Sequence, residues 1–225
     1  MKHTMEIIAR IKTDFPTKFG VPRQSGMVEN MAQIIFEPPY RSEDAIRGIE
    51  GFSHLWLIWH FSEAKRETEA LTVRPPRLGG NERVGVFATR SPFRPNSLGL
   101  SSVKLERVEY TENGPILFVS GADLMDGTPI FDVKPYLPFT DSHADAKAGF
   151  TEHVSHELSV EIQTDFPTNF PKEKVEPLKR TLALDPRPSY HTDETRIYGM
   201  PYAGFDIRFF VKEKTLVVTE IAPLP

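Results

Sequence analysis

Cysteine is absent from all 225 residues of this chain. Disulfide bonds, thiolate metal sites and cysteine nucleophiles are therefore excluded. Without cysteine, and without a His-Glu-x-x-His motif, the neighbouring His153 and His156 do not form a recognisable zinc site, so we expect no bound metal. A chain without disulfides also suits the reducing cytoplasm, which is where we expect it.

Long apolar runs are missing as well. The longest, Phe52–Phe61, is interrupted by one serine and two histidines and is well short of the ~20 residues of a membrane-spanning helix. The first ten residues hold no apolar stretch followed by small residues, so a secretory signal is not supported. We expect no membrane segment and no membrane partner.

The glycine loops of the common nucleotide-binding folds are also absent. No Gly-x-Gly-x-x-Gly motif follows a predicted strand, and the chain has no Gly-x4-Gly-Lys-Ser/Thr loop. In doubly wound folds these loops bring backbone N–H groups close to phosphates. A doubly wound cofactor-binding domain is therefore disfavoured.

The residues that are present favour a folded protein rich in strands. Hydrophobic residues make up 39% of the chain and charged residues 26%, which is enough to bury a core. Many of the 20 prolines lie in or beside connections, where they fit between short strands better than inside helices. Short apolar or β-branched runs recur at 6–11, 27–36, 52–61, 84–89, 103–110, 116–122 and 130–133. We predict a mainly β fold, a barrel or a sandwich.

The final third of the chain has a different pattern. Residues Asp141–Gly149 are small and polar, which is typical of an exposed linker. We place a domain boundary there, with one domain at 1–145 and a second at 146–225.

The second domain is predicted to be small and α+β. Pro171 is placed to open a helix with one apolar face, formed by Val175, Leu178 and Leu182. The runs Phe205–Val211 and Leu216–Ile221 predict a hairpin. The string Thr-Asp-Phe-Pro-Thr occurs at both Thr13 and Thr164, but its flanks diverge and we interpret it as coincidence.

Positive charge is concentrated in one segment. The chain as a whole carries a net charge of −4, yet Arg74–Arg107 holds seven basic and two acidic residues, a local charge of +5. The segment is also rich in glycine and proline, which predicts a stiff loop that lies close to a ligand. Arginine forks suit a cofactor carboxylate, an RNA backbone or both. The alternative is a solvated loop whose arginines form ion pairs.

A second cluster follows at Asp123–Asp141. Asp126-Gly127 is a turn signal that would place Asp123 and Asp126 on one side of a tight bend, where carboxylates accept from ribose hydroxyls or a cofactor amine. The alternative is that these carboxylates only cap their own backbone. Further on, Asp132, Lys134 and Tyr136 alternate and would share one face of a strand, where they are our catalytic candidates.

These stretches together resemble the TsaA/TrmO-like family of tRNA (adenine-N6) methyltransferases. The matching motifs are Val21–Gln24, Gly48–Trp56, Thr72–Leu100, Asp123–Asp141 and Asp185–Tyr190. The resemblance implies a β-barrel domain that binds S-adenosylmethionine, a small C-terminal domain and a homodimer. It also implies methylation of N6 of threonylcarbamoyladenosine at position 37, in the anticodon loop of tRNA.

The resemblance further implies which residues contact the cofactor. Carried over position by position, they are Pro22, Arg23, Gln24, Ser62, Glu63, Arg90, Leu100, Asp123, Leu124, Met125 and Asp126. The chain departs from the family pattern at Ser62-Glu63, where other members have His-Gln, and at Asn96–Gly99, where Asn-Pro-Ile-Gly is more familiar.

A single-stranded RNA loop is expected to be bound by stacking and backbone contacts. Our candidates for those contacts are Arg41, Arg74, Arg77, Arg94, Arg187 and Tyr190. Two other functions fit parts of the pattern: an RNA-binding barrel without catalysis, and a methyltransferase that acts on a small molecule or a protein.

Overall fold

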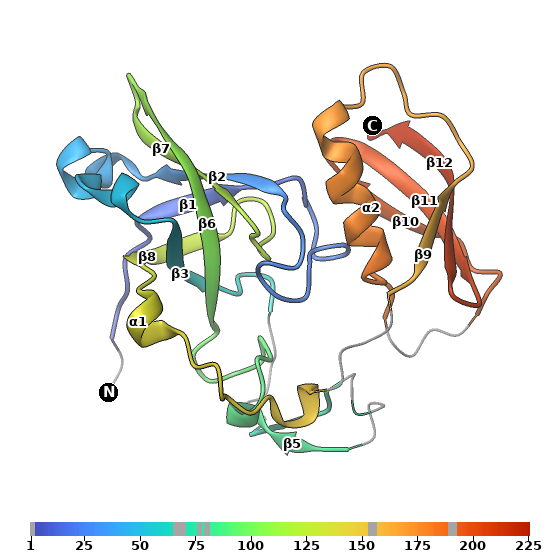
Figure 1. Ribbon diagram of the computed structural model, residues 1–225, viewed down its shortest axis with the longest axis horizontal. Coiled ribbons are helices and arrows are strands. Elements are labelled where there is room, and N and C mark those ends of the chain that lie inside the picture. Colours follow the sequence, from blue (N-terminus) through green and yellow to red (C-terminus); the bar gives the residue numbers. More distant parts are fainter. Residues whose placement is uncertain (1–2, 65–70, 76–77, 79–81, 153–156, 189–192) are drawn as a thin grey trace.

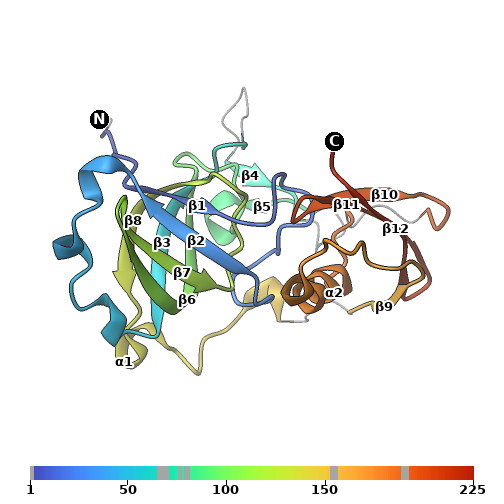
Figure 2. The same ribbon diagram turned by 90° about the horizontal axis from the view of Figure 1, so that it is seen from above.

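The computed structural model describes residues 3–64, 71–75, 78, 82–152, 157–188 and 193–225. Figures 1 and 2 show two lobes side by side, a barrel and a smaller sheet covered by a helix. The predicted mainly β fold with an α+β tail is confirmed.

Six antiparallel strands close the barrel in the order β1-β2-β7-β6-β3-β8. They are β1 Ala9–Lys12, β2 Met31–Phe36, β3 His54–His60, β6 Leu98–Thr111, β7 Gly114–Ser120 and β8 Pro129–Pro135. Closure pairs every strand on both sides, so the barrel has no free edge.

Alternation along each strand fills the barrel. In β3 the inward residues Leu55, Leu57 and Trp59 are buried, and the residues that alternate with them, including the histidines at both ends, face outward. The neighbouring β6 has the same alternation over its first half, from Leu98 to Val103. The period of two that predicted these strands is thus the period that buries their apolar side chains.

One predicted strand is wrong beyond its first two residues. Within the predicted run 84–89, Val84–Gly85 forms β5, which pairs with β4 Thr72–Val73. Val86–Ala88 then turns as a 3-10 helix. Thr89 closes this turn because both its backbone N–H and its hydroxyl donate to the carbonyl of Val86.

The second lobe is a four-stranded sheet in the order β10-β11-β12-β9, and it includes the predicted hairpin. Its strands are β9 Ser159–Ile162, β10 Tyr198–Tyr202, β11 Phe205–Lys212 and β12 Thr215–Pro223. The helix α2 Val175–Ala183 buries Leu178 and Leu182 against the sheet. Pro177 is tolerated because it lies in the first turn, where the backbone N–H has no partner within the helix. A one-turn helix, α1 Pro138–Asp141, leads into the exposed connection at 142–149.

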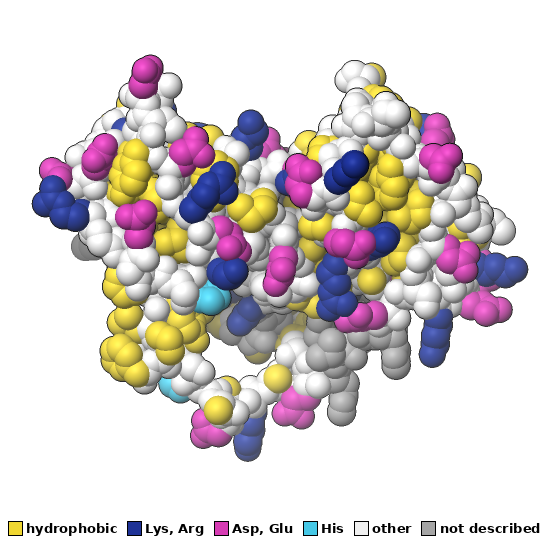
Figure 3. Space-filling view, turned by 45° about the horizontal axis from the view of Figure 1, so that its top comes forward, with side chains coloured by type: hydrophobic (Ala, Val, Ile, Leu, Met, Phe, Trp, Pro, Cys, Tyr) yellow, Lys and Arg dark blue, Asp and Glu magenta, His cyan; other side chains and the backbone are white. Residues whose placement is uncertain are grey.

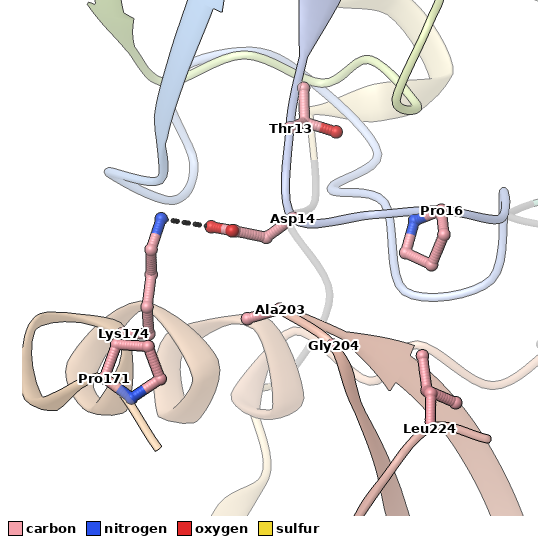
Figure 4. A pocket seen from close by; sticks show the side chains of 8 residues that line it. All are labelled: Thr13, Asp14, Pro16, Pro171, Lys174, Ala203, Gly204 and Leu224. Atoms are coloured by element: carbon pink, nitrogen blue, oxygen red, sulfur yellow. Dashed lines mark hydrogen bonds and ion pairs between the residues drawn. The ribbon is translucent and has the colours of Figure 1, made fainter. Parts of the chain in front are cut away.

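The segment that follows β1 joins the two lobes. Phe15 is completely buried, and its side chain belongs to the core of the second lobe. At the seam between the lobes Asp14 pairs with Lys174, and Tyr202 donates to the side-chain oxygen of Asn30. Figure 4 shows the Asp14–Lys174 pair beside a pocket lined by residues of both lobes. The segment at 13–30, which connects two strands of the barrel, therefore contributes side chains to the core of the second lobe.

Candidate cofactor and RNA sites

Asp123 lies in the connection after β7, between the core residues Ala122 and Leu124. Its Oδ1 atom accepts a hydrogen bond from the hydroxyl of Ser101 at 2.5 Å, and its carboxylate also accepts from the backbone N–H of Ser25. The loop that carries Ser25 comes this close because Gly26 donates to the carbonyl of Gly121 at 2.8 Å. Burial raises the pKa of the Asp123 carboxyl group, and these hydrogen bonds oppose that effect.

Gln24 and Arg90 lie at the same place. The guanidinium of Arg90 donates to the side-chain oxygen of Gln24, and its positive charge acts on Asp123. Gln24 follows β1, Arg90 lies in the basic segment and Asp123 follows β7. The fold thus brings together three residues from three distant motifs, all of them predicted cofactor contacts.

Other predicted cofactor positions on the same two loops have structural partners. Arg23 donates through one nitrogen to the carbonyls of Asp185 and Arg187, at 3.1 and 3.2 Å, and so ties its loop to the second lobe. Pro22 is buried next to it, and the side chain of Leu124 is buried in the barrel core. From these positions Pro22 and Leu124 can offer a ligand backbone atoms only.

The turn at Asp126-Gly127 forms as predicted. The backbone N–H of Thr128 donates to the carbonyl of Met125, and Gly127 has the positive φ that such turns favour. Asp126 does not share the partners of Asp123, because its Oδ1 atom accepts from the backbone N–H of Thr13 at 2.9 Å. The carboxylate of Asp126 therefore caps a backbone N–H that is distant in sequence rather than its own turn, and its predicted role as a cofactor contact stays a prediction.

The remaining cofactor positions lie where β3 ends beside the start of β6. Ser62 and Glu63 form a turn after β3, and the backbone N–H of Phe61 donates to the carbonyl of Ser97 at 2.9 Å. Leu100 is 58% exposed and faces outward from β6, whereas its neighbour Ser101 faces inward. The side chain of Leu100 therefore points away from Asp123.

The three catalytic candidates share one outer face of the barrel. Lys134 and Asp132 form an ion pair at 2.9 Å, as expected for side chains two residues apart on one strand. The ring of Tyr136 lies 5.4 Å from that of Trp56 on β3, whose indole N–H donates to Asp141 at 2.8 Å. Asp132 and Lys134 share a face of β8 as predicted, Tyr136 follows the end of that strand beside Trp56, and a catalytic role stays a prediction.

The candidate RNA-binding arginines differ in whether their guanidinium groups already have hydrogen-bond partners within the protein. Arg187 is bonded through two nitrogens to the carboxylate of Asp185, at 2.8 and 2.9 Å. Arg41 donates to the carbonyl of Phe36 and Arg94 to that of Thr89. Arg74 is exposed. Arg77 and Tyr190 lie outside the residues that the structure describes.

Charges of both signs are interspersed on the face shown in Figure 3, and no basic patch covers either lobe there. The described part of the chain contains no cluster of three or more histidine and acidic side chains arranged to hold a metal ion. Among its helices, none is both long and apolar enough to cross a membrane.

Comparison with known proteins identifies the family. The N-terminal domain of tRNA-methyltransferase O matches residues 10–142, and the C-terminal domain of the same family matches residues 150–224. This chain belongs to the tRNA-methyltransferase O family.

Named relatives and a solved structure match three quarters or more of this chain. The tRNA (adenine(37)-N6)-methyltransferase of Escherichia coli is 39% identical over 97% of each chain. An enzyme of the same name from Eikenella corrodens is 44% identical over 75% of this chain and 96% of its own. The crystal structure of TrmO from Pseudomonas aeruginosa superposes with a TM-score of 0.77 at 29% identity, covering 99% of both chains.

Family motifs alone miss two residues of the Asp123 site in this tRNA-methyltransferase O member. Ser25 contributes a backbone N–H, which no side-chain pattern reveals. Ser101 is 1% exposed and occupies an inward position of β6. A serine at a core position of an alternating strand is the signal that could have identified it.

Proposed function

We propose that this chain transfers a methyl group from S-adenosylmethionine to N6 of adenosine 37 in tRNA that carries the threonylcarbamoyl group at that position. Family membership confirms the predicted enzyme class, a tRNA (adenine(37)-N6)-methyltransferase, and the predicted cofactor. The observation that carries the proposal is the convergence of Gln24, Arg90 and Asp123 on one place.

The chemistry of this cluster suits the cofactor. S-adenosylmethionine carries a carboxylate, an ammonium group and a sulfonium, and its adenine and ribose offer further donors. Asp123 supplies a partly buried carboxylate for the cationic or donor groups, and Arg90 supplies a guanidinium for the carboxylate. The pKa of Asp123 stays raised despite the hydrogen bonds from Ser101 and Ser25, so a cationic group of the ligand would further stabilise its carboxylate.

The target nitrogen is a weak nucleophile. Its lone pair is delocalised into the adenine ring, and the threonylcarbamoyl group makes its proton more amide-like. Catalysis therefore comes mainly from holding this nitrogen in line with the methyl group, with help from a group that takes the proton. Asp132, Lys134 and Tyr136 are the candidates, and within the ion pair Asp132 is the acceptor.

The modified base also offers a handle for recognition. The threonyl carboxylate adds a negative charge that an arginine fork binds through two hydrogen bonds. Arg74, exposed in the basic segment, is free to supply this contact or one to an RNA phosphate.

Transfer of a labelled methyl group from the cofactor into total tRNA tests the proposal. We expect label in tRNA and none in protein or small-molecule acceptors. Label that appears only in those acceptors would assign a different methyltransferase activity, and cofactor binding without any transfer would overturn the proposal.

Three finer points belong to the same proposal. The protein acts in the cytoplasm, together with its tRNA substrate. Its two domains meet between residues 145 and 146. Two copies of the chain form a homodimer. Leu100 on β6 and Phe139 on α1 are large apolar side chains, 58% and 87% exposed, that a second copy could cover. Light scattering on the purified protein should give twice the mass of the chain, and the mass of one chain would contradict the dimer.

A further inference from the structure

We infer that Ser101 is a positioning residue of the cofactor site, whose hydroxyl group keeps the Asp123 carboxylate oriented to receive the donor groups of the cofactor. The inference rests on the proposed function, because it takes Asp123 to be a cofactor contact. It adds two residues, Ser101 and Trp59, that do not touch the ligand themselves.

The direction of the hydrogen bonds is fixed by chemistry. An indole N–H can only donate, and Trp59 Nε1 lies 2.9 Å from the hydroxyl oxygen of Ser101. Ser101 therefore accepts from Trp59 and directs its single proton to Oδ1 of Asp123, 2.5 Å away. Because Ser101 and Trp59 are 1% and 6% exposed, water does not compete for either bond.

Packing holds the start of this chain of hydrogen bonds in place. The indole of Trp59 lies directly on Gly99, where an added Cβ atom would stand only 2.2 Å from the ring. The ring of Phe61 covers the indole, with centroids 4.2 Å apart. Gly99 and Ser101 are two residues apart on β6, so both face inward. Trp59 is thus confined to the position from which it donates to Ser101.

The electrostatics of Asp123 agree with this role. Burial raises the pKa of its carboxyl group, and the hydrogen bond from Ser101 is the strongest opposing influence. The backbone N–H of Ser25 and the charge of Arg90 act in the same direction as Ser101. Removing the serine hydroxyl leaves burial less opposed, so the pKa of Asp123 should rise and the carboxylate should protonate at higher pH.

The test is the dissociation constant of S-adenosylmethionine, measured by calorimetry over a pH series for the full-length protein. Ser101→Ala should weaken binding by about tenfold or more, the usual effect of losing a hydrogen bond to a charged group. The fall in affinity at acid pH should also move to higher pH. Ser101→Thr retains the hydroxyl and should restore both quantities toward wild type.

Ser120→Ala is the matched control. Ser120 is also a buried serine in a barrel strand, and its hydroxyl donates to a different carboxylate, Glu106, at 2.6 Å. Its loss should leave the affinity and pH profile of cofactor binding unchanged. A second variant, Trp59→Phe, deletes the indole donor and should shift both quantities in the same direction as Ser101→Ala.

The outcomes separate the inference from the proposed function. Wild-type protein that binds no cofactor overturns the proposed function and the inference together. Wild-type binding that Ser101→Ala neither weakens nor shifts in pH overturns the inference alone. Equal losses in Ser101→Ala and Ser120→Ala, without a pH shift, would show a merely structural effect and would also overturn it.

Discussion

At the scale of single residues, Asp123 links stability to function. Its carboxyl group has a raised pKa because it is buried, so folding favours the neutral acid over the carboxylate. This contribution to stability is fully present below the pKa of the unfolded chain and is lost as pH rises through the higher folded pKa. At neutral pH the carboxylate therefore destabilises the ligand-free protein, and cofactor binding offsets this cost.

Asp123→Asn should consequently raise the melting temperature of the ligand-free protein at neutral pH while weakening cofactor binding. The advantage of the variant should shrink as pH falls toward the range where Asp123 is protonated in both states. Thermal melts of both proteins over a pH series measure this difference. A difference that stays constant with pH, or a variant that melts lower at neutral pH, contradicts the assignment.

Gly99 is important because the indole ring of Trp59 packs directly against its backbone. A methyl group at this position would overlap the indole ring of Trp59. Gly99→Ala should therefore destabilise the protein by about 1–3 kcal/mol, as overpacking usually does. Gly85→Ala is the control, because an added Cβ there meets no atom of the described residues within 4 Å. Denaturant unfolding of the two variants makes the comparison, and equal stability would show that Trp59 is not held as described.

At the scale of secondary-structure elements, the sequence predicts those strands and helices that local residue patterns determine. The strands of the barrel follow from alternation, and α2 follows from an apolar face opened near a proline. The strand predicted at 84–89 is wrong after Gly85. The hydroxyl of Thr89 donates a hydrogen bond to the carbonyl of Val86 and stabilises a turn there, and residue propensities for strands take no account of such a side-chain hydrogen bond. The Asp126-Gly127 turn was predictable, but the capping partner of Asp126 was not, because Thr13 is distant in sequence.

The segment between β1 and β2 has no regular secondary structure, and it contacts both the core of the second lobe and the Asp123 cluster. Phe15 and Phe19 pack on the second lobe, and Gln24 and Ser25 lie at Asp123. Phe15→Ala should therefore destabilise the protein by about 3–5 kcal/mol and weaken cofactor binding through the displaced loop. Denaturant melts and cofactor titration check both effects. Phe87→Ala, at a side chain 73% exposed, should change neither, and a Phe15→Ala protein with normal cofactor affinity would disprove the coupling.

At the scale of the whole molecule, the site depends on contacts that no local pattern reveals. The string Thr-Asp-Phe-Pro-Thr, whose repetition was interpreted as coincidence, contains Phe15 in its first copy and Phe166 in its second, and Phe19 and Phe170 each follow two residues after a copy. Phe15 and Phe170 belong to the core of the second lobe, and Phe19 and Phe166 pack against it. The three cofactor candidates Gln24, Arg90 and Asp123 were identified through resemblance to a family. Their meeting point was not predictable from spacing, because it requires closure of the barrel.

The basic segment and the cofactor cluster together lead to a prediction about the substrate. tRNA that lacks the threonylcarbamoyl group should be a much poorer methyl acceptor than the modified tRNA, because it lacks the carboxylate that an arginine fork would bind. A charge-assisted hydrogen bond contributes about 1.5–3 kcal/mol, which corresponds to roughly 10- to 150-fold in selectivity if it is realised in the transition state. Better positioning of the target nitrogen would enlarge the ratio.

The measurement is methyl incorporation into one tRNA prepared with and without the modification, at matched and low concentrations. Arg74→Ala serves as the variant, and it should reduce the ratio of kcat/KM values if its guanidinium binds the threonyl carboxylate. If Arg74 binds a phosphate instead, kcat/KM should fall by the same factor for both tRNAs. The slope of log binding constant against log salt concentration should then decrease by about one, as for the loss of one phosphate contact. Equal kcat/KM values for the two tRNAs with wild-type protein would refute the threonylcarbamoyl substrate, even for an active methyltransferase.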